Sequence, residues 1–453
     1  MGDKWQYMPF SEAVVVNPSV SLKRGETYPY VDMQAVDPSR PTVGPSRLRE
    51  FAGGGSRFEP YDTLMARITP CLENGKIARY VPDDEYFGPA FGSTEFIVIR
   101  GKEGVTDNDF VFYLTRWREF RSFAIAQMTG SSGRQRVPAE SLAGFEVPVP
   151  PLPEQRAIAR ILGTLDDKIE LNRRMNETLE AMAQALFKSW FVDLDPVVVN
   201  ALRAGNPIPE KFAERAAWYG RGMPRPDNAL GLPEDILRLF PDRFVDSELG
   251  PIPEGWEVKA LDEIAHFQNG LALQKYRPKP GEPKLPVVKI AQLRSGRADG
   301  NEWASTNIRP DCIIDDGDVV FSWSGSLLLK IWCGGRAALN QHLFKVTSSE
   351  YPKWFYYHWI DEHLPEFIHI ASGKATTMGH IKRHHLSEAK CVVPEQTLMS
   401  KVHSHFESLL VKRIENELES RTLATLRDTL LPKLISGELR VPDVERFLKE
   451  RGL

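Results

Sequence analysis

The sequence of 453 residues lacks several features that mark common functional classes. Its four cysteines are scattered without a CxxC pair, which argues against a zinc ribbon and against a disulfide framework. No histidine precedes His266, so histidine-based acid–base or metal chemistry is excluded from the first half. No apolar run approaches the roughly 20 residues that span a bilayer, and the start shows no signal-peptide pattern. We therefore expect a cytoplasmic protein that does not bind a membrane.

A surplus of basic residues is also missing. The chain has 57 Lys and Arg against 61 Asp and Glu, a net charge of −4 and a pI of about 6.3. Proteins that bind DNA alone and tightly usually carry a basic surplus, because neutralising phosphates supplies much of the affinity. Either this protein does not bind DNA, or its basic groups are local and a partner supplies the rest.

Sequence patterns of catalysis are absent or incomplete. There is no GxxxxGK[ST] phosphate loop and no [ND]PP[YF] tetrapeptide typical of amino-methyltransferases. His380 and His384 are four residues apart without a third ligand at an obvious spacing, so a solvated basic loop is favoured over zinc. Asp242, Glu257 and Lys259 resemble a Mg²⁺-binding nuclease pattern, but no strand precedes Asp242, and we interpret the match as coincidence. We expect no catalytic residue and no metal ligand.

What the chain does contain is an internal repeat. Four weak matches occur in the same order in its two halves: residues 5–12 with 256–263, 61–65 with 317–321, 92–98 with 339–346, and Pro-Glu-Gln at 153–155 with 394–396. A shared order at similar offsets indicates two tandem units. Each unit combines short apolar runs bounded by Gly, Pro and Ser, as in strands, with aromatic segments that suit short helices. The predicted fold class is α+β.

Each unit ends in a long helical pattern that begins after Pro-Glu-Gln. In the first helix, two heptad positions hold Ile158, Leu165, Asn172, Leu179 and Leu186, and Ile161, Lys168, Met175 and Met182. This spacing is typical of a coiled coil, and the helix from 154 to 191 would be roughly 55 Å long. The second helix, 395–431, has a similar pattern. The alternative is that these are ordinary core helices. However, neither has a third helix adjacent in sequence to pack on, while each has the other. We expect an antiparallel pair that separates the two units.

The segment between the first helix and Trp256 is rich in proline. Residues 196–250 should not form a continuous helix or a central strand. We expect an extended surface linker with short helical pieces near residues 209–219 and 233–240.

Two loops suit nucleic acid, and both lie shortly before Pro-Glu-Gln. Residues 129–136 and 372–385 combine glycines and hydroxyls with Arg, Lys, Gln or His. Arg can read guanine edges, Gln can read adenine, and hydroxyls and Lys can hold phosphates. A basic loop is often only solvated, but this one recurs in both halves. The candidate DNA-binding residues here are Arg134, Gln135, Arg136, Lys374, Thr376, Thr377, His380, Lys382 and Arg383.

Several segments together resemble the specificity subunit of type I restriction–modification systems, and the resemblance covers essentially the whole chain. They are PPLPEQRAI at 150–158, FKSWFVD at 187–193, FVDSELGPIPEGW at 244–256, LLPKLISGEL at 430–439, LMARITPCLENGK at 64–76 and DGDVVFSWSGS at 316–326. The last two resemble that family's recognition strand and loop, which adds Arg67 and Ser324 to the candidate DNA-binding residues. The long connector at about 196–245 departs from the family pattern.

The resemblance implies two target recognition domains, residues 1–150 and 251–393, that each read half of a split DNA site. It implies a central spacer helix at 151–195, a connector at 196–250, a C-terminal spacer helix at 394–438 and a tail at 439–453. The expected partners are double-stranded DNA, two methyltransferase subunits and restriction subunits. S-adenosylmethionine, ATP and Mg²⁺ would be used by these partners, with no cofactor bound by this chain. The competing classes are a Mg²⁺-dependent nuclease and a coiled-coil scaffold that does not touch DNA.

Overall fold

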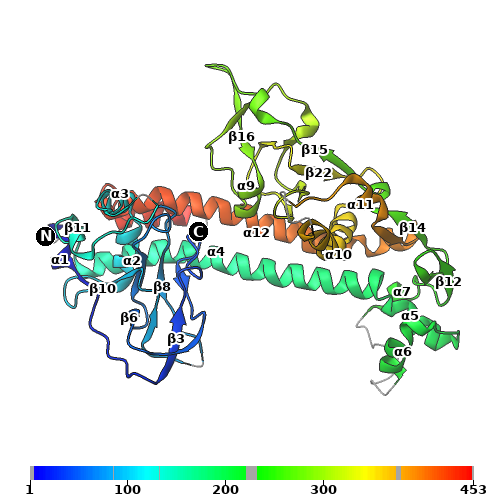
Figure 1. The fold of residues 1–453 in the computed structure, drawn as a ribbon, viewed down its shortest axis with the longest axis horizontal. Helices are drawn as coiled ribbons and strands as arrows, with labels where there is room; N and C mark the ends of the chain where they lie inside the picture. The colour runs from blue at the N-terminus through cyan, green and yellow to red at the C-terminus, as the bar shows by residue number, and fades with distance from the viewer. Residues whose placement is uncertain (1–4, 85, 132, 221–231, 374–378, 451–453) are drawn as a thin grey trace. The chain divides into compact units, whose positions relative to one another are not determined.

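The computed structural model describes residues 5–84, 86–131, 133–220, 232–373 and 379–450. The chain forms two compact units (Figure 1). Unit 1 comprises Met1–Leu171 and Ser420–Leu453, and unit 2 comprises Asn172–Glu419. Within the described residues, no helix is both long enough and apolar enough to span a membrane.

Unit 1 contains two main sheets. One has the order β2 (Val14–Val16), β10 (Phe96–Gly101), β7 (Thr63–Ala66), β8 (Ile77–Tyr80), β4 (Thr42–Val43). The other has the order β5 (Arg47–Glu50), β3 (Thr27–Val31), β9 (Ala90–Gly92), β6 (Ser56–Phe58). A separate antiparallel pair joins β1 (Gln6–Pro9) to β11 (Glu146–Val149). In the chain, the short helix α1 (Phe10–Ala13) follows β1, and the short helix η1 (Ala139–Leu142) precedes β11.

One helix, α2 (Asn108–Arg116), packs on the first sheet of unit 1, and α3 (Arg118–Ala126) follows it and contacts it. Figure 1 shows α2 beside β8 and β10. The side chain of Asp107 caps α2 by accepting from the backbone N–H of Asp109 at 3.0 Å. Every α2 residue from 110 to 115 is buried, because this helix packs on β10 and on α4 in one apolar cluster.

Unit 2 repeats the plan of unit 1. Its first sheet has the order β15 (His266–Asn269), β22 (Leu343–Thr347), β19 (Val319–Ser322), β20 (Leu329–Ile331). Its second has the order β17 (Trp303–Ser305), β16 (Lys284–Val288), β21 (Ala337–Leu339), β18 (Ile313–Ile314). In the second sheets, β3 runs parallel to β9 and β16 runs parallel to β21. The pair of β14 (Glu257–Ala260) with β23 (Lys390–Val393) matches β1 with β11. The internal repeat predicted from sequence is thus confirmed.

Between β14 and β23, one helix is longer than the others. That helix is α10 (Lys353–Ser372), and the others are α8 (Leu261–Ile264), η5 (Leu273–Lys275), α9 (Ile290–Ser295), η6 (Pro310–Cys312) and α11 (Arg383–Glu388). In α10, the buried side chains of Trp354, Phe355 and Tyr356 belong to the main apolar cluster of unit 2.

Two long helices contribute to both units. They are α4 (Leu152–Phe187) and α12 (Gln396–Ser436), with α13 (Val441–Glu450) after α12. In unit 2, Asn172 donates to Glu419 at 2.8 Å, and Asn176 donates to the carbonyl of Arg413 at 3.2 Å. Numbering rises along α4 as it falls along α12, so the predicted antiparallel pairing is confirmed.

One part of the heptad prediction is wrong. Ile158, Leu165 and Asn172 are buried as expected, but in the other heptad position Met182 is 49% exposed. The residues buried there are Leu162, Asn176 and Ala183, one position further along the helix than the predicted Ile161, Met175 and Met182. Ile161 is also buried. The seam therefore follows a 4–3 spacing from Ile158, which places polar Asn176 where it can bond to α12.

The connector differs from the extended surface linker that we expected. After a π-helical turn η2 (Lys188–Val192) it forms α5 (Asp195–Ala204), η3 (Glu210–Phe212), α6 (Ala213–Gly220), α7 (Glu234–Leu237), and the hairpin of β12 (Phe244–Ser247) with β13 (Gly250–Pro253). The helical pieces predicted near 209–219 and 233–240 are confirmed by η3, α6 and α7. The surface location is wrong, because Val198, Phe212 and Phe240 are buried in the unit 2 core.

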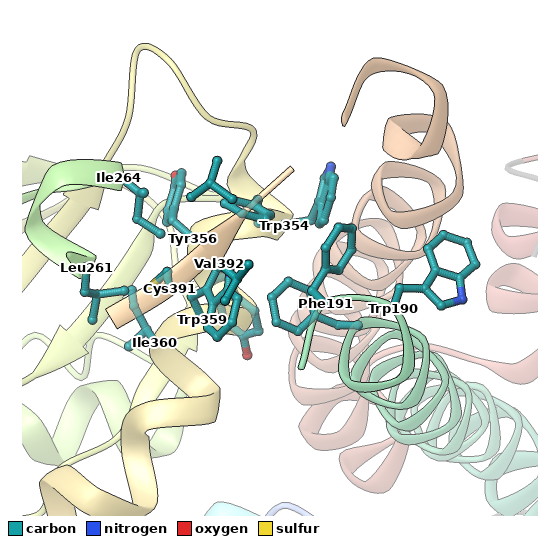
Figure 2. Packing of buried hydrophobic residues seen from close by; sticks show 14 of the residues in the cluster. Trp190, Phe191, Leu261, Ile264, Trp354, Tyr356, Trp359, Ile360, Cys391 and Val392 are labelled. Carbon is teal, nitrogen blue, oxygen red and sulfur yellow. The ribbon is translucent and has the colours of Figure 1, made fainter. Parts of the chain in front are cut away.

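Aromatic packing explains why the connector folds inward. Trp190 and Phe191 lie in the same apolar cluster as Trp354 of α10 (Figure 2). The ring of Trp190 meets Phe240 at 5.9 Å, and Phe191 meets Trp354 at 5.8 Å. Large aromatic side chains lose much exposed apolar area on packing, which favours a compact connector despite its prolines.

Candidate nucleic-acid interface

In unit 1, the loop after β7 pairs with one of the two basic loops. The backbone N–H of Thr69 donates to the carbonyl of Gln135 at 3.0 Å, and that of Val137 donates to the carbonyl of Arg67 at 2.8 Å. Ile68 and Arg136 form an antiparallel bridge. The structure thus brings Arg67, Gln135 and Arg136 together at the end of a buried strand. Arg134, in the same loop, is exposed.

Arg136 is held by an acidic residue that sequence reasoning missed. Its Nε donates to both carboxylate oxygens of Glu95 at 3.0 Å, and its Nη2 donates to Oε1 at 2.6 Å. These hydrogen bonds raise the pKa of Arg136. Glu95 directly precedes β10, so an acidic residue just before a buried strand was the available signal. An acidic residue at this position does not indicate DNA binding from sequence alone, because acidic side chains are not a usual mark of DNA-binding sites.

Unit 2 contains the same loop pairing. The N–H of Gly325 donates to the carbonyl of Gly379 at 2.8 Å, and that of Ile381 donates to the carbonyl of Trp323 at 3.0 Å. Ser324 and His380 form an antiparallel bridge that corresponds to Ile68 and Arg136. The structure brings these two predicted residues together, although Ser324 is buried.

The other predicted residues of unit 2 are more dispersed. Lys382 and Arg383 are exposed at the start of α11. The backbone N–H of Lys382 donates to Nδ1 of His385 at 3.0 Å, and Nη2 of Arg383 donates to the carbonyl of Phe267 at 3.3 Å. Three further predicted residues, Lys374, Thr376 and Thr377, lie outside the described residues.

Two ring-bearing residues beside His380 were also missed as candidates. The indole of Trp323 lies 5.8 Å from the ring of His342 and 6.3 Å from that of His380. The indole Nε1 donates to the carbonyl of Gln341 at 3.2 Å, which fixes the plane of the ring. Trp323 directly follows β19 and His342 directly precedes β22, and only the strand register reveals that these two positions are adjacent.

The structure also places the residues considered for metal chemistry. In α11, ligand atoms of His384, His385 and Glu388 lie within 4.8 Å of one another, on a largely exposed surface. Lys259 donates to the hydroxyl of Tyr351 at 3.0 Å and pairs with Glu257 at 3.3 Å; the bond to Tyr351 is the larger cause of its raised pKa. This lysine is therefore held in its charged form.

Comparisons with known proteins identify the family. A family model described as the type I restriction modification DNA specificity domain matches residues 63–181 and 253–420, more than half of the chain. The HindI specificity subunit of Haemophilus influenzae is 25% identical, with 87% of this chain and 90% of that protein covered. The MjaIX specificity subunit of Methanocaldococcus jannaschii is 28% identical, with 76% and 71% covered.

Among solved structures, the type I restriction–modification S subunit from M. genitalium is 14% identical over 95% of this chain and 96% of that chain, with a TM-score of 0.47. The family match rests on the sequence model, which covers more than half of the chain. The chain belongs to the type I restriction–modification DNA specificity family, and its function is the recognition of DNA sequence.

Proposed function

We propose that each unit reads one half of a bipartite DNA site and that the chain itself performs no catalysis. The observation that carries this proposal is the recurrence of one loop pairing, Ile68 with Arg136 in unit 1 and Ser324 with His380 in unit 2. Equivalent loops at equivalent strand ends are expected of two modules that carry out the same task on two different sequences.

The side chains of these loops suit base edges in the major groove and phosphates of the DNA backbone. The two loop pairs bring Arg67 and Gln135 together in unit 1, and a tryptophan and two histidines together in unit 2. Arg and Gln match guanine and adenine edges, and Lys382 and Arg383, exposed on α11, suit phosphates. These residues remain candidates for DNA contact.

The partners in the proposal follow from the family. Two methyltransferase subunits dock on this chain and modify DNA with S-adenosylmethionine, and restriction subunits use ATP and Mg²⁺. The net charge of −4 supports shared DNA binding, because a chain without a basic surplus gains from phosphate contacts made by partners. The assembly acts in the cytoplasm.

Methylation mapping in cells tests the proposal. A host that expresses the methyltransferase subunit with this chain should methylate one motif with two defined halves and an unread gap. The same host without the chain should show no such motif. A continuous motif, or an identical motif without the chain, contradicts the proposed function.

The absence of catalysis has its own test. The purified chain with Mg²⁺ and plasmid DNA should give no cleavage, methylation or ATP hydrolysis above background. Turnover that survives stringent purification and disappears in Asp242→Ala or Glu257→Ala would instead support the nuclease alternative.

A further inference from the structure

Three positions at the loop pair are equivalent in the two units but differ in chemistry. In unit 1, Ala66 pairs with Phe96, and in unit 2 Ser322 pairs with Leu343. The residue after the first strand and the residue before the second are therefore Arg67 and Glu95 in unit 1, and Trp323 and His342 in unit 2. The bridging residues of the basic loops, Arg136 and His380, complete each trio.

The unit 1 trio fixes a guanidinium from one side. Glu95 binds Arg136 through Nε and Nη2, at 3.0 and 2.6 Å, while Nη1 donates to the carbonyl of Arg134 at 3.3 Å. A guanidinium has five N–H donors in a plane, and these contacts leave one hydrogen on each terminal nitrogen for the outer edge. The side chain of Arg136 is 44% exposed, so that edge can reach a ligand.

An outer edge of this kind matches one base. Paired parallel N–H donors fit the O6 and N7 acceptors of guanine in the major groove. Holding the guanidinium in place before binding reduces the conformational entropy that the contact would otherwise lose. The side chain of Glu95 is only 23% exposed, about half as much as that of Arg136, so the guanidinium is the more accessible of the two groups to a base that approaches from solvent.

The unit 2 trio offers no such fork. Trp323, His342 and His380 form a ring cluster with centroid distances of 5.8 and 6.3 Å from the indole. Flat apolar faces and single ring N–H groups can contact a thymine methyl or one acceptor, but they cannot make a planar bidentate contact with guanine.

We propose that Glu95 is a positioning residue that sets Arg136 to read a guanine in the half-site of unit 1, whereas the ring trio of unit 2 reads its half-site without such a contact. This inference rests on the proposed function, because it assigns part of the readout to named residues. It predicts that the two half-sites differ in chemistry at the position that the trio reads.

The experiment uses the assembled complex and duplexes built on the methylation motif of the wild-type protein. Each guanine of the unit 1 half-site is replaced in turn by 7-deazaguanine, which lacks the N7 acceptor. Binding should weaken at one position, by about 5- to 150-fold for a full bidentate contact and less for one lost acceptor. Arg136→Lys, which keeps the charge and loses the fork, should abolish this sensitivity while binding in general persists.

The decisive variant is Glu95→Gln. It should reduce the sensitivity to 7-deazaguanine at that same position several-fold and leave the unit 2 half-site unaffected. Glu59→Gln is the matched control, because Glu59 also pairs with an arginine of unit 1, Arg100, at 2.8 Å. A thermal unfolding curve for each variant shows whether the fold is intact.

Two results would overturn the inference without touching the proposed function. One is that Arg136→Lys leaves the effect of 7-deazaguanine on binding unchanged at every guanine of the unit 1 half-site. The other is a folded Glu95→Gln variant with wild-type sensitivity at every guanine. A wild-type protein without a bipartite motif would instead contradict the proposed function.

Discussion

At the scale of single residues, Asp166 shows how unit 1 holds α2 and α12 against α4. Its Oδ1 accepts from Arg427 at 2.5 Å and its Oδ2 accepts from the hydroxyl of Tyr113 at 2.9 Å. The side chains of Asp166 and Arg427 are only 2% and 6% exposed. Removal of one partner from such a pair leaves the other charge buried without full compensation.

Asp166→Ala should therefore lower the free energy of unfolding by about 3 kcal/mol, measured by urea denaturation. The pairing of Arg427 with Asp428 at 2.7 Å keeps the loss at the lower end of the range for buried pairs. Asp167→Ala is the control, since Asp167 is exposed on the same helix and should change stability by less than about 0.5 kcal/mol. Equal losses in the two variants would contradict this account of the pair.

His358 gives unit 2 a pH-dependent stability. Burial is the larger cause and the charge of Arg413 the smaller one, and together they lower the pKa of His358 to about 3. A histidine in the unfolded chain has a pKa of about 6.5. The unfolded chain therefore binds a proton at this residue below about pH 6.5, and the folded chain does so only near pH 3. This contribution is fully present above the unfolded pKa and is lost as the pH falls towards 3.

Urea denaturation between pH 7 and pH 5 should accordingly show a stability loss of about 1–2 kcal/mol from His358. His358→Phe should flatten the slope, and its ring can occupy the same site beside Phe187, whose centroid lies 5.1 Å away. His369→Phe is the control on the exposed side of the same helix. A slope that His358→Phe leaves unchanged would show that this residue does not titrate as described.

Arg136 and Glu95 mark the limit of prediction at this scale. The loop around Arg136 could be chosen from sequence, because Gly, Arg and Gln together suit DNA and the pattern recurs. Glu95 could not be chosen, because it lies 41 residues away and reaches Arg136 only through the pairing of β7 with β10 and of two loops. Single-sequence patterns do not report such tertiary contacts.

At the scale of elements, the polar layer in the long helices of unit 2 sets their register. The amide of Asn416 donates to Oδ1 of Asn176 at 2.9 Å, and Asn176 donates to the carbonyl of Arg413 at 3.2 Å. Polar residues in a helix seam favour one register at some cost in stability. The predicted seam at Met175 and Met182 failed because apolar residues were preferred there, whereas α12 offers hydrogen-bond partners to Asn176.

A double-mutant cycle on Asn176 and Asn416 tests the layer. Asn176→Leu should lower the free energy of unfolding by about 1–3 kcal/mol, because it leaves a buried amide without its partner. The double Leu variant should lose less than the sum of the single variants, with a coupling energy above about 0.5 kcal/mol. Thr178→Ala, exposed on the same helix, is the control. Additive single effects would show that the two asparagines do not act together.

At the scale of the whole molecule, the repeat was predictable and the sheet topology was not. Short matches at similar offsets, and Pro-Glu-Gln before each long helix, were enough to indicate two units. The parallel pairing of β3 with β9 and of β16 with β21 joins strands far apart in the chain, and no local pattern encodes it. The inward packing of the connector was not predicted, because its prolines favour an extended linker and the sequence does not show that Trp190 packs on Phe240.

The central claim is that two equivalent modules each read one half of a split site. Its most direct test replaces residues 251–393 with the recognition domain of another specificity subunit and maps methylation in cells that express the complete system. One half of the motif should change, while the other half stays as in the wild type. The matching exchange of residues 1–150 should change only the other half. A change in both halves after a single exchange, or in neither, would contradict the modular account.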